Sequence, residues 1–500
     1  MGVRGLQGFV ARFCPDACQT VDLREMAEKH RIDHPDSPPV IVVDAMSCVR
    51  HWYTPESWVC GGQWREYLVI LQDFINAFMA AGIKLVFYFD GVVEEKKRDE
   101  WIKRRMKNTE EIARLFWFIK THRKQPGREM FVLPSALPTF TRYALKSLGQ
   151  KTVCTLQEAD FEVAAYGLQH NCIGILGQDS DYLIYNTCPY FSIENLRLDR
   201  LVTVMYSREV LAKEQHIQSE NFSIFNILSH GGIECSNSLE DDCDTEIPGQ
   251  ALIYRPARQH IYSILLESGK GGTCPLVKEW CVYFGNPLRQ PDLIQPVQPS
   301  VTGGTPNLKT LWFAKGPDVE KQRYSTFLAC FHLQDEMEEL QALEAPVAGF
   351  CCLLAYLMMQ VSSLSLEDLN AFLALILCLK GKSAAQLIGL QLAEVDSRAV
   401  HLGAVLIRGL TTLLMANSAC GFPFRMDDLM PWAVFDGKLF QEKYQKSHRG
   451  CSVEELLEGN VEDRDIHTGG DTTFLLSKEF MSTSGKLGWW NSCHWDNCCL

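Results

Sequence analysis

Short apolar runs rich in β-branched residues alternate with helix-like patterns over residues 1–207. Val40–Asp44 (VIVVD) is such a run and predicts a buried strand, and the apolar residues between Trp64 and Met79 then recur at helical spacing. The same alternation continues, with strands predicted at 84–89, 131–133, 151–153 and 172–176 and helices at 94–122, 139–148 and from about 158. Strands that alternate with helices indicate a parallel sheet with helices on both faces.

The pattern changes after residue 207. Residues 208–250 include an acidic stretch (SNSLEDDCDTEIPG) that is typical of a linker or a long loop, and we expect an irregular connecting region over 251–332. From 333 to 447 the apolar residues recur at helical spacing, which predicts a separate α-helical domain. The tail over 448–500 is acidic and then rich in Gly, Ser and Trp, so we expect it to be disordered.

Composition and charge narrow the class of protein. The chain is 46% hydrophobic and can fill real cores, whereas its net charge of -13 argues against a surface that binds nucleic acid generally. The first residues lack the apolar core of a signal peptide, and the longest charge-free apolar run, 345–359, is shorter than the ~20 residues of a membrane span. We therefore expect an intracellular protein with no membrane segment. Its 20 cysteines include no CxxC pair, which favours buried thiols over structural zinc.

Carboxylates stand where the predicted strands end. Three aspartates directly follow strands, one lies two residues further on, and two acidic residues open the helix before the last of these strands. Since parallel strands end at one edge of a sheet, we expect all six to converge. They are Asp44, Asp90, Glu158, Asp160, Asp179 and Asp181.

Such a cluster favours divalent cations, because buried like charges raise each other's pKa unless they are neutralised. Oxygen ligands select Mg²⁺ or Mn²⁺, and two ions ~4 Å apart can stabilise the attacking and leaving oxygens of a phosphoryl displacement. Taken singly, each position fits a turn residue or a helix N-cap as well. Convergence of six is what favours a shared metal site.

Two cations follow Asp90 in the charged stretch EEKKRDEWIKRRMKN. Lys97 and Arg104 are seven residues apart and so lie on one helical face, from which they could reach a phosphate held at the carboxylates. A solvated helix with internal Glu and Lys pairs explains the same pattern equally well.

The acidic motifs resemble a known enzyme family. The sequences MGVRGL, VVDAM, FYFDG, QEADFE and GQDSDYL are similar to those of the flap endonuclease/XPG family of structure-specific nucleases, over about residues 1–205. The resemblance implies a PIN-like, flap-endonuclease-like parallel sheet domain. It also implies that the six carboxylates bind catalytic metals and that Lys97 and Arg104 contact the scissile phosphate.

Longer stretches resemble a narrower family within that superfamily, the constitutive coactivators of peroxisome proliferator-activated receptor gamma and their paralogues. These stretches are YTPESWVCGGQWREY, DEWIKRRMKN and AAYGLQHNCIGILGQDSDYLIYNTCPYFSI. The resemblance implies a transcriptional coactivator in the nucleus, with the cytoplasm as a second location. Its partners would be a nuclear receptor or other transcription proteins, and a mainly α-helical domain would follow the nuclease-like one.

Two departures from the nuclease pattern bear on catalysis. A seventh aspartate, in a Gly-containing helical hairpin that grips duplex DNA in the family, has no counterpart after Ser207, and Asp160 stands where the family usually has Glu. The acidic run at Glu240, Asp241, Asp242 and Asp244 is no substitute, and we expect a solvated loop there. The lost hairpin removes phosphate contacts, which supply much of the affinity for nucleic acid, or marks a shortened form of the protein.

We therefore expect a nuclear receptor coactivator whose nuclease-like domain does not cleave. The alternative is a Mg²⁺- or Mn²⁺-dependent structure-specific endonuclease with a two-metal carboxylate site, and a scaffold for RNA complexes is a third possibility. Leu410, Leu413 and Leu414 match the LxxLL pattern that docks into receptor grooves, but leucines at this spacing are more often core.

Overall fold

The computed structural model describes residues 6–54, 58, 60–91, 93, 95–155, 159–207, 233–235, 238–266, 275–283 and 285–458. Met1–Gly450 form one compact unit and Cys451–Leu500 a second, whose described part holds the short helix α20 (Val453–Leu456). Both sides of the division predicted at residue 207 lie within the first unit. Glu158, residues 208–232 of the predicted linker and residues 459–500 of the predicted tail lie outside the described residues.

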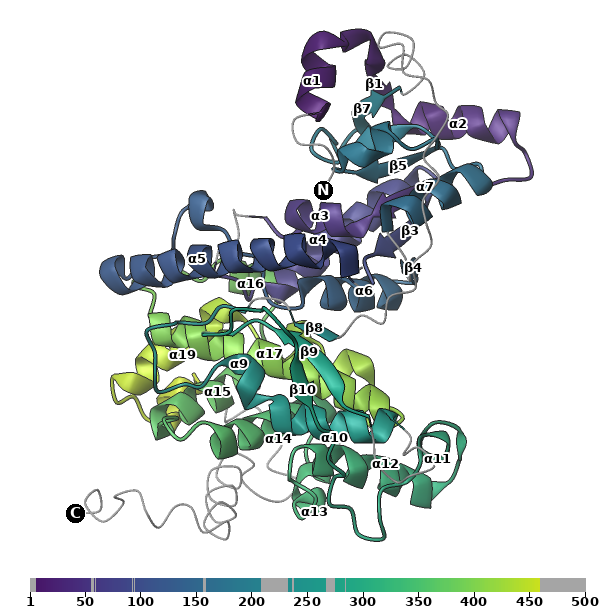
Figure 1. Ribbon diagram of the computed structural model, residues 1–500. Helices are drawn as coiled ribbons and strands as arrows, with labels where there is room; N and C mark the ends of the chain where they lie inside the picture. Colours follow the sequence, from purple (N-terminus) through teal and green to yellow (C-terminus); the bar gives the residue numbers. More distant parts are fainter. Residues whose placement is uncertain are drawn as a thin grey trace, which may run out of the picture. The chain divides into compact units, whose positions relative to one another are not determined.

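A seven-stranded sheet organises residues 6–207, the α/β part of the first unit (Figure 1). Its strand order is β1-β7-β6-β5-β2-β3-β4. The pairs from β6 to β4 are parallel, and β7 runs antiparallel to both β6 and β1. The strands are β1 (Cys18–Asp22), β2 (Val40–Asp44), β3 (Lys84–Phe89), β4 (Lys151–Cys154), β5 (Gly174–Gly177), β6 (Tyr190–Ser192) and β7 (Val202–Tyr206). The predicted α/β fold with a parallel sheet is confirmed.

Helices cover both faces of this sheet because its central strands are apolar on both sides. Val42 and Val86 pack in one cluster with Val163 of α7, whereas on the opposite face Phe87 meets Trp52 of α3 edge-on, with ring centroids 6.0 Å apart. The helices are α1 (Leu6–Phe13), α2 (Leu23–Asp33), α3 (Ala45–Trp52), α4 (Trp64–Ala80), α5 (Arg98–His122), α6 (Leu137–Ser147) and α7 (Ala159–Gln169).

One predicted strand is wrong. Residues 131–133 form no strand but connect a short 3-10 helix, η3 (Arg128–Met130), to α6. Phe131 instead stacks on Tyr53, with ring centroids 6.2 Å apart. The apolar side chains of this segment therefore serve packing between helices, which short apolar runs cannot distinguish from a buried strand.

Residues 238–450 form the helical part of the first unit. Between 251 and 332, where the sequence predicts an irregular region, the chain forms helices and the strands β9 and β10, which join the earlier strand β8 in a small sheet of order β10-β9-β8. The strands are β8 (Ile233–Cys235), β9 (Val277–Cys281) and β10 (Asp292–Ile294). The helices are α9 (Gln250–Ile253), α10 (Arg255–Leu265), α11 (Leu308–Phe313), α12 (Pro317–Cys330), α13 (Met337–Gln341), α14 (Ala345–Gln360), α15 (Leu366–Leu379), α16 (Ala384–Ile388), α17 (Ser397–Ala419), α18 (Pro431–Val434) and α19 (Gly437–His448).

Helix α17 is the central helix of the helical part. Among the described residues it is the one helix long and apolar enough to cross a membrane, but 89% of its apolar window is buried inside the protein. Leu410, Leu413 and Leu414 lie on it and are at most 3% exposed. The structure thus places the LxxLL leucines in the core, where a receptor groove could not reach them without unfolding of the helix.

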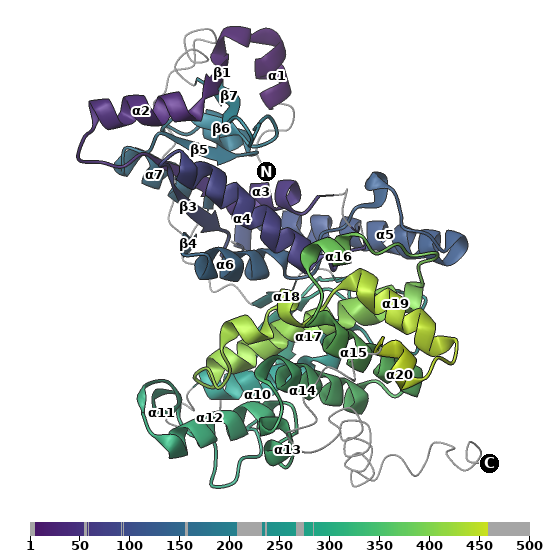
Figure 2. The same ribbon diagram turned by 180° about the vertical axis from the view of Figure 1, so that it is seen from behind.

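The α/β part and the helical part are joined along a seam (Figure 2). Helix α5 contributes a buried face, Ile112, Leu115, Phe116 and Ile119, which packs in one cluster with Leu239, Val395 and Val400. Elsewhere on the seam the backbones touch, since the Gly437 N–H donates to the Gly62 carbonyl at 3.0 Å. A Cβ on Gly62 would lie 2.9 Å from the Gly437 Cα, so only glycine fits there.

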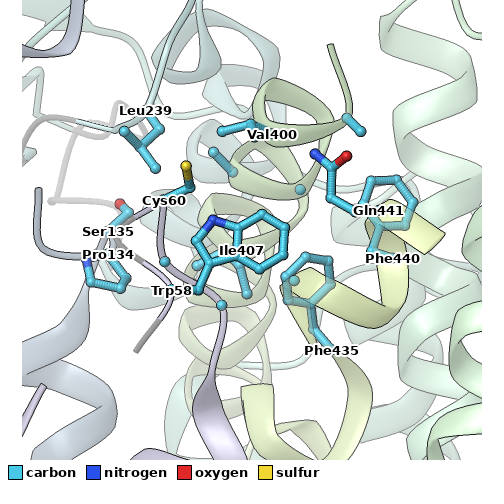
Figure 3. Close-up of a pocket in the computed structure, with 16 residues that line it drawn as sticks. Trp58, Cys60, Pro134, Ser135, Leu239, Val400, Ile407, Phe435, Phe440 and Gln441 are labelled. Atoms are coloured by element: carbon cyan, nitrogen blue, oxygen red, sulfur yellow. The ribbon is translucent and has the colours of Figure 1, made fainter. Parts of the chain in front are cut away.

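A cavity of about 40 Å³ lies on the seam (Figure 3). It is lined mainly by apolar side chains of both parts, including Trp58, Cys60, Val400, Ile407, Phe435 and Phe440. Small-molecule pockets usually enclose roughly 300 Å³ or more, so this space is a packing gap with room for a few water-sized groups.

A candidate metal site at the edge of the sheet

Asp44 marks the edge of the sheet where β2 ends and α3 begins. Its carboxylate caps α3 by accepting a hydrogen bond from the Ser47 N–H at 3.2 Å. The Ser47 hydroxyl in turn accepts a hydrogen bond from the Gln178 N–H at 3.0 Å, which ties the end of β2 to the residue after β5. A Cβ on Gly177 would lie 3.3 Å from the Cβ of Asp44, so glycine leaves room for this close approach.

Three further aspartates meet at this edge. Asp160, Asp179 and Asp181 each offer a carboxylate oxygen, and these atoms lie within 4.8 Å of one another. Asp179 caps the 3-10 helix η4 (Ser180–Leu183) by accepting from the Asp181 N–H at 3.1 Å. Asp160 stands in the first turn of α7 and accepts from the buried Tyr182 hydroxyl at 3.2 Å. An aspartate at this edge can therefore cap a helix and still offer an oxygen to a metal ion. The helix-cap and metal-ligand interpretations of these positions do not exclude each other.

Asp90 follows β3 and is exposed. The chain turns sharply at the next residue, where the Gly91 N–H donates to the Thr155 hydroxyl at 3.2 Å. A Cβ on Gly91 would lie 1.8 Å from the Thr155 carbonyl oxygen, so the DG sequence is what lets β3 end beside β4. This turn holds Asp90 at the same edge as the other carboxylates.

The carboxylates at the edge of the sheet raise one another's pKa. Burial, together with the charges of Asp90 and Asp179, raises the pKa of Asp44 to about 6. Burial likewise raises the pKa of Asp160 to about 7, with further contributions from Asp179, Asp44 and Asp90. Carboxylates that are buried together without a cation favour protonation, or the binding of a positive ion.

The donor set fits a hard divalent cation. Asp44, Asp160, Asp179 and Asp181 offer carboxylate oxygens alone, which is the ligand type that Mg²⁺ and Mn²⁺ prefer. The raised pKa values of Asp44 and Asp160 are also those of groups that a cation would stabilise in their charged form.

The two predicted phosphate ligands lie on exposed positions. Lys97 ends the 3-10 helix η2 (Glu95–Lys97), and Arg104 of α5 pairs with Glu100 one turn earlier at 3.3 Å. Between them, Arg98 is buried and its guanidinium lies 4.6 Å from the ring centroid of Trp280 in β9. The start of α5 is therefore anchored to the helical part.

The acidic run at 240–244 is not a solvated loop, so that prediction is wrong. Asp241 is 6% exposed and pairs with Lys120 of α5 at 2.5 Å. Asp244 lies 3.7 Å from Arg398 and 3.4 Å from His401, both on α17. Lys120 and Arg398, which are distant in sequence, thus bind Asp241 and Asp244 and make the run a latch between α5 and the helical part, which we call the acidic latch (240–246).

Ser47, Gly177 and Tyr182 complete the site, and sequence reasoning did not single them out. Gly177 and Tyr182 lie within the GQDSDYL motif, and Ser47 lies one turn after Asp44. A helix N-cap at Asp44 implies a donor three residues later, so the capping rule was a signal for Ser47. Nothing in the spacing identifies Tyr182 as the donor to Asp160.

Comparisons with known proteins place the chain in a family. No family model matches it. It is 42% identical to the constitutive coactivator of peroxisome proliferator-activated receptor gamma of Bos taurus, covering 92% of this chain and 93% of that protein. The mouse and human proteins of the same name are 39% and 33% identical, with 92% of this chain and 90% and 91% of theirs covered.

The relatives carry sequence that this chain lacks. The matches extend over 651, 708 and 830 residues, each more than the 500 residues of this chain. Internal segments of the relatives therefore have no counterpart here.

Solved structures are more distant. The catalytic core of Rad2 in complex with DNA substrate is 19% identical, with 44% of this chain and 57% of that chain covered and a TM-score of 0.29. The Holliday junction-resolving enzyme GEN1 in complex with product DNA and Mg²⁺ is 13% identical, with 42% and 41% covered and a TM-score of 0.27. The assignment to a family rests on the sequence relatives instead: the chain belongs to the family of constitutive coactivators of peroxisome proliferator-activated receptor gamma.

Proposed function

We propose that this protein is a nuclear transcriptional coactivator that acts with a nuclear receptor, and that its nuclease-like α/β part is a scaffold that does not cleave nucleic acid. The observation that carries this proposal is the identity with three named coactivators over 92% of the chain and at least 90% of each relative. The family name supplies the receptor, peroxisome proliferator-activated receptor gamma, as the first partner to test.

The seam supports the scaffold role. Helix α5 carries Arg104 near its start, yet one face of its last turns is buried against the helical part and its Lys120 is bound to the acidic latch. After the helix, Arg123 pairs with Glu394 at 3.2 Å. A helix fixed in this way connects the two parts.

A reporter assay tests the proposal. Cells that express the receptor and a receptor-driven reporter receive the full chain or its Asp179→Ala/Asp181→Ala variant, and both are also localised by microscopy. We expect nuclear protein and equal activation by the two chains at equal expression. Absence of activation by the wild type would sink the coactivator proposal. Activation that the folded double variant lacks would show that the acidic edge is required.

The second candidate is a Mg²⁺- or Mn²⁺-dependent structure-specific endonuclease. It is favoured by the three carboxylates within 4.8 Å of one another and by the neighbouring Asp44. Asp44, Asp160, Asp179 and Asp181 would hold the cations, which when bound would stabilise charge on phosphoryl oxygens. Lys97 and Arg104 would contact the phosphate.

Cleavage assays separate the two candidates. Purified full chain is incubated with flap, bubble and single-stranded DNA or RNA in Mn²⁺, next to the Asp179→Ala/Asp181→Ala variant. Under the coactivator proposal the two proteins give the same background. Cleavage by the wild type alone would establish the second candidate.

A further inference from the structure

Three aromatic side chains form an exposed cluster on the helical part, at α11. Trp312, Phe313 and Phe422 are 44%, 76% and 49% exposed. The ring of Trp312 lies 5.8 Å from that of Phe422 and 6.4 Å from that of Phe313. We call these three residues the aromatic patch. Contiguous exposed apolar surface of this kind is a usual mark of an interaction site.

The patch is held in place by a close contact between α11 and the loop after α17. A Cβ on Gly421 would lie 2.0 Å from the Leu311 carbonyl oxygen, so only glycine allows the loop to approach. Arg323 of α12 donates to the Leu311 carbonyl at 2.6 Å and to the Ala314 carbonyl at 2.9 Å. Both sides of the patch are therefore fixed to the core.

Phe422 itself is strained. Its φ is +63°, in the left-handed region that bulky residues rarely adopt. The strain is maintained because the Phe422 N–H donates to the Asn417 carbonyl, while the buried Asn417 side chain bonds both the N–H and the carbonyl of Phe424. Strain that keeps an aromatic ring in solvent does not serve the core, and strained residues concentrate at binding sites.

The charged residues nearest the patch in the sequence are positive, and the acidic Asp318 and Asp427 lie just beyond them. From Leu293 to Gly316 and from Asn417 to Met426 the chain carries no acidic residue, although its net charge is -13. These two segments contribute Lys309, Lys315 and Arg425, all exposed. A partner that covers the patch meets apolar rings bordered by cations.

We propose that the aromatic patch is a docking site for a peptide segment of another protein that carries large apolar side chains flanked by acidic residues. Aromatic anchors supply most of the affinity at protein interfaces, and border charges select the partner by complementarity. Nucleic acid is the less favoured occupant, because its affinity depends on how many phosphates are neutralised and the patch offers three cations. The inference does not rest on the proposed function.

Panning of a phage-displayed random peptide library on the immobilised full chain tests this proposal. The enriched peptides are synthesised and measured by fluorescence anisotropy, next to a thymidine oligonucleotide of similar length. We expect enrichment of Leu, Phe or Trp beside Asp or Glu. Binding should weaken about tenfold or more with Phe313→Ala, and similarly with Lys309→Glu and Lys315→Glu together.

The variant Phe422→Gly separates loss of binding from loss of folding. The substitution removes the ring and relieves the strain, so the variant should melt no lower than the wild type and still bind peptide about tenfold more weakly. Trp117→Ala is the matched control, since Trp117 is 65% exposed on α5 and should be neutral. Peptides that bind Phe313→Ala and Phe422→Gly as well as the wild type would overturn the proposal. So would a lack of enrichment, enriched peptides without acidic residues, or patch-dependent binding of the oligonucleotide alone.

Discussion

The molecule contains two clusters of carboxylates, the edge of the sheet and the acidic latch, whose members differ in their charged neighbours. At the edge of the sheet, burial and mutual repulsion raise the pKa of Asp44 to about 6 and that of Asp160 to about 7. In the acidic latch, burial raises the pKa of Glu240 to about 7 and also raises that of Asp242, but a hydrogen bond with His401 lowers the pKa of Asp244, and Lys120 pairs with Asp241. The difference follows from the neighbours, since Asp241 and Asp244 lie beside cations of the protein, whereas Asp44 and Asp160 lie among other carboxylates.

Removal of a latch cation should have the largest effect. Arg398 pairs with Asp368, which is fully buried, at 3.1 Å and lies 3.7 Å from Asp244. Arg398→Met should lower the free energy of unfolding by ~3 kcal/mol, because buried carboxylates lose a charge partner. Arg425→Met is the control, since Arg425 is 80% exposed and 4.0 Å from Asp427, and should cost at most ~0.5 kcal/mol. Denaturant titrations giving equal losses would refute the structural role of the latch.

Addition of Mn²⁺ should stabilise the chain through the edge and not through the latch. A ligand present at about 100 times its Kd raises the free energy of unfolding by ~2.7 kcal/mol. We expect Mn²⁺ to raise the free energy of unfolding by about that amount, and with it the melting temperature, for the wild type and for Asp244→Asn. We expect no such increase for Asp179→Asn. EDTA should reverse the shift. A wild type that does not respond to Mn²⁺ or Mg²⁺ would show that the edge is no metal site.

Without metal, Asp160→Asn should stabilise the chain at neutral and higher pH. The folded pKa of Asp160 is raised from 3.8 to about 7, so the folded state holds its proton more tightly than the unfolded chain does. The wild type therefore loses stability as pH rises between these values, and the variant avoids a loss on the order of 2 kcal/mol after allowance for solvent. Below about pH 4 the two should converge, as urea titrations in EDTA can check. Equal stability of the two at pH 8 would contradict the repulsion described above.

Asp244→Asn should have the opposite sign and the smallest effect. Its folded pKa is lowered, so its contribution is present above the unfolded value of 3.8 and is lost as pH falls through the folded pKa. At pH 7 the variant should be less stable than the wild type by about 1 kcal/mol, because the group is partly solvated. The difference should vanish in acid. If Asp244→Asn stabilised the chain at pH 7, the opposite pKa shifts described for Asp244 and Asp160 would be contradicted.

The sheet and its edge could be predicted because their signals are local. Val40–Asp44 is a β-branched run that ends in an aspartate, and in parallel strands such ends share one edge. The latch could not be found in this way. Nothing beside Asp241 or Asp244 in the sequence reveals Lys120 or Arg398, and an acidic stretch without cations nearby is usually solvated.

The helical part was predicted only where its helices are long and apolar. Between 251 and 332 the elements bury charge, as with Arg258 and Glu279, which pair at 2.7 Å with both side chains at most 3% exposed. Helix periodicity depends on apolar residues, so a buried ion pair looks like surface. The strained conformation of Phe422 could not be predicted from the sequence either. It depends on contacts made by Asn417 and Gly421 and not on the conformational preference of Phe422 itself.

The backbone contact between Gly62 and Gly437 has a consequence for how such a protein can be altered. Neither residue has a side chain that substitution could trim, and a larger one would meet the opposite main chain. The α/β part is therefore a poor candidate for transplantation into another protein. A fragment that ends at residue 207 would leave the Gly62 carbonyl and the apolar face of α5 in water, and would be expected to aggregate.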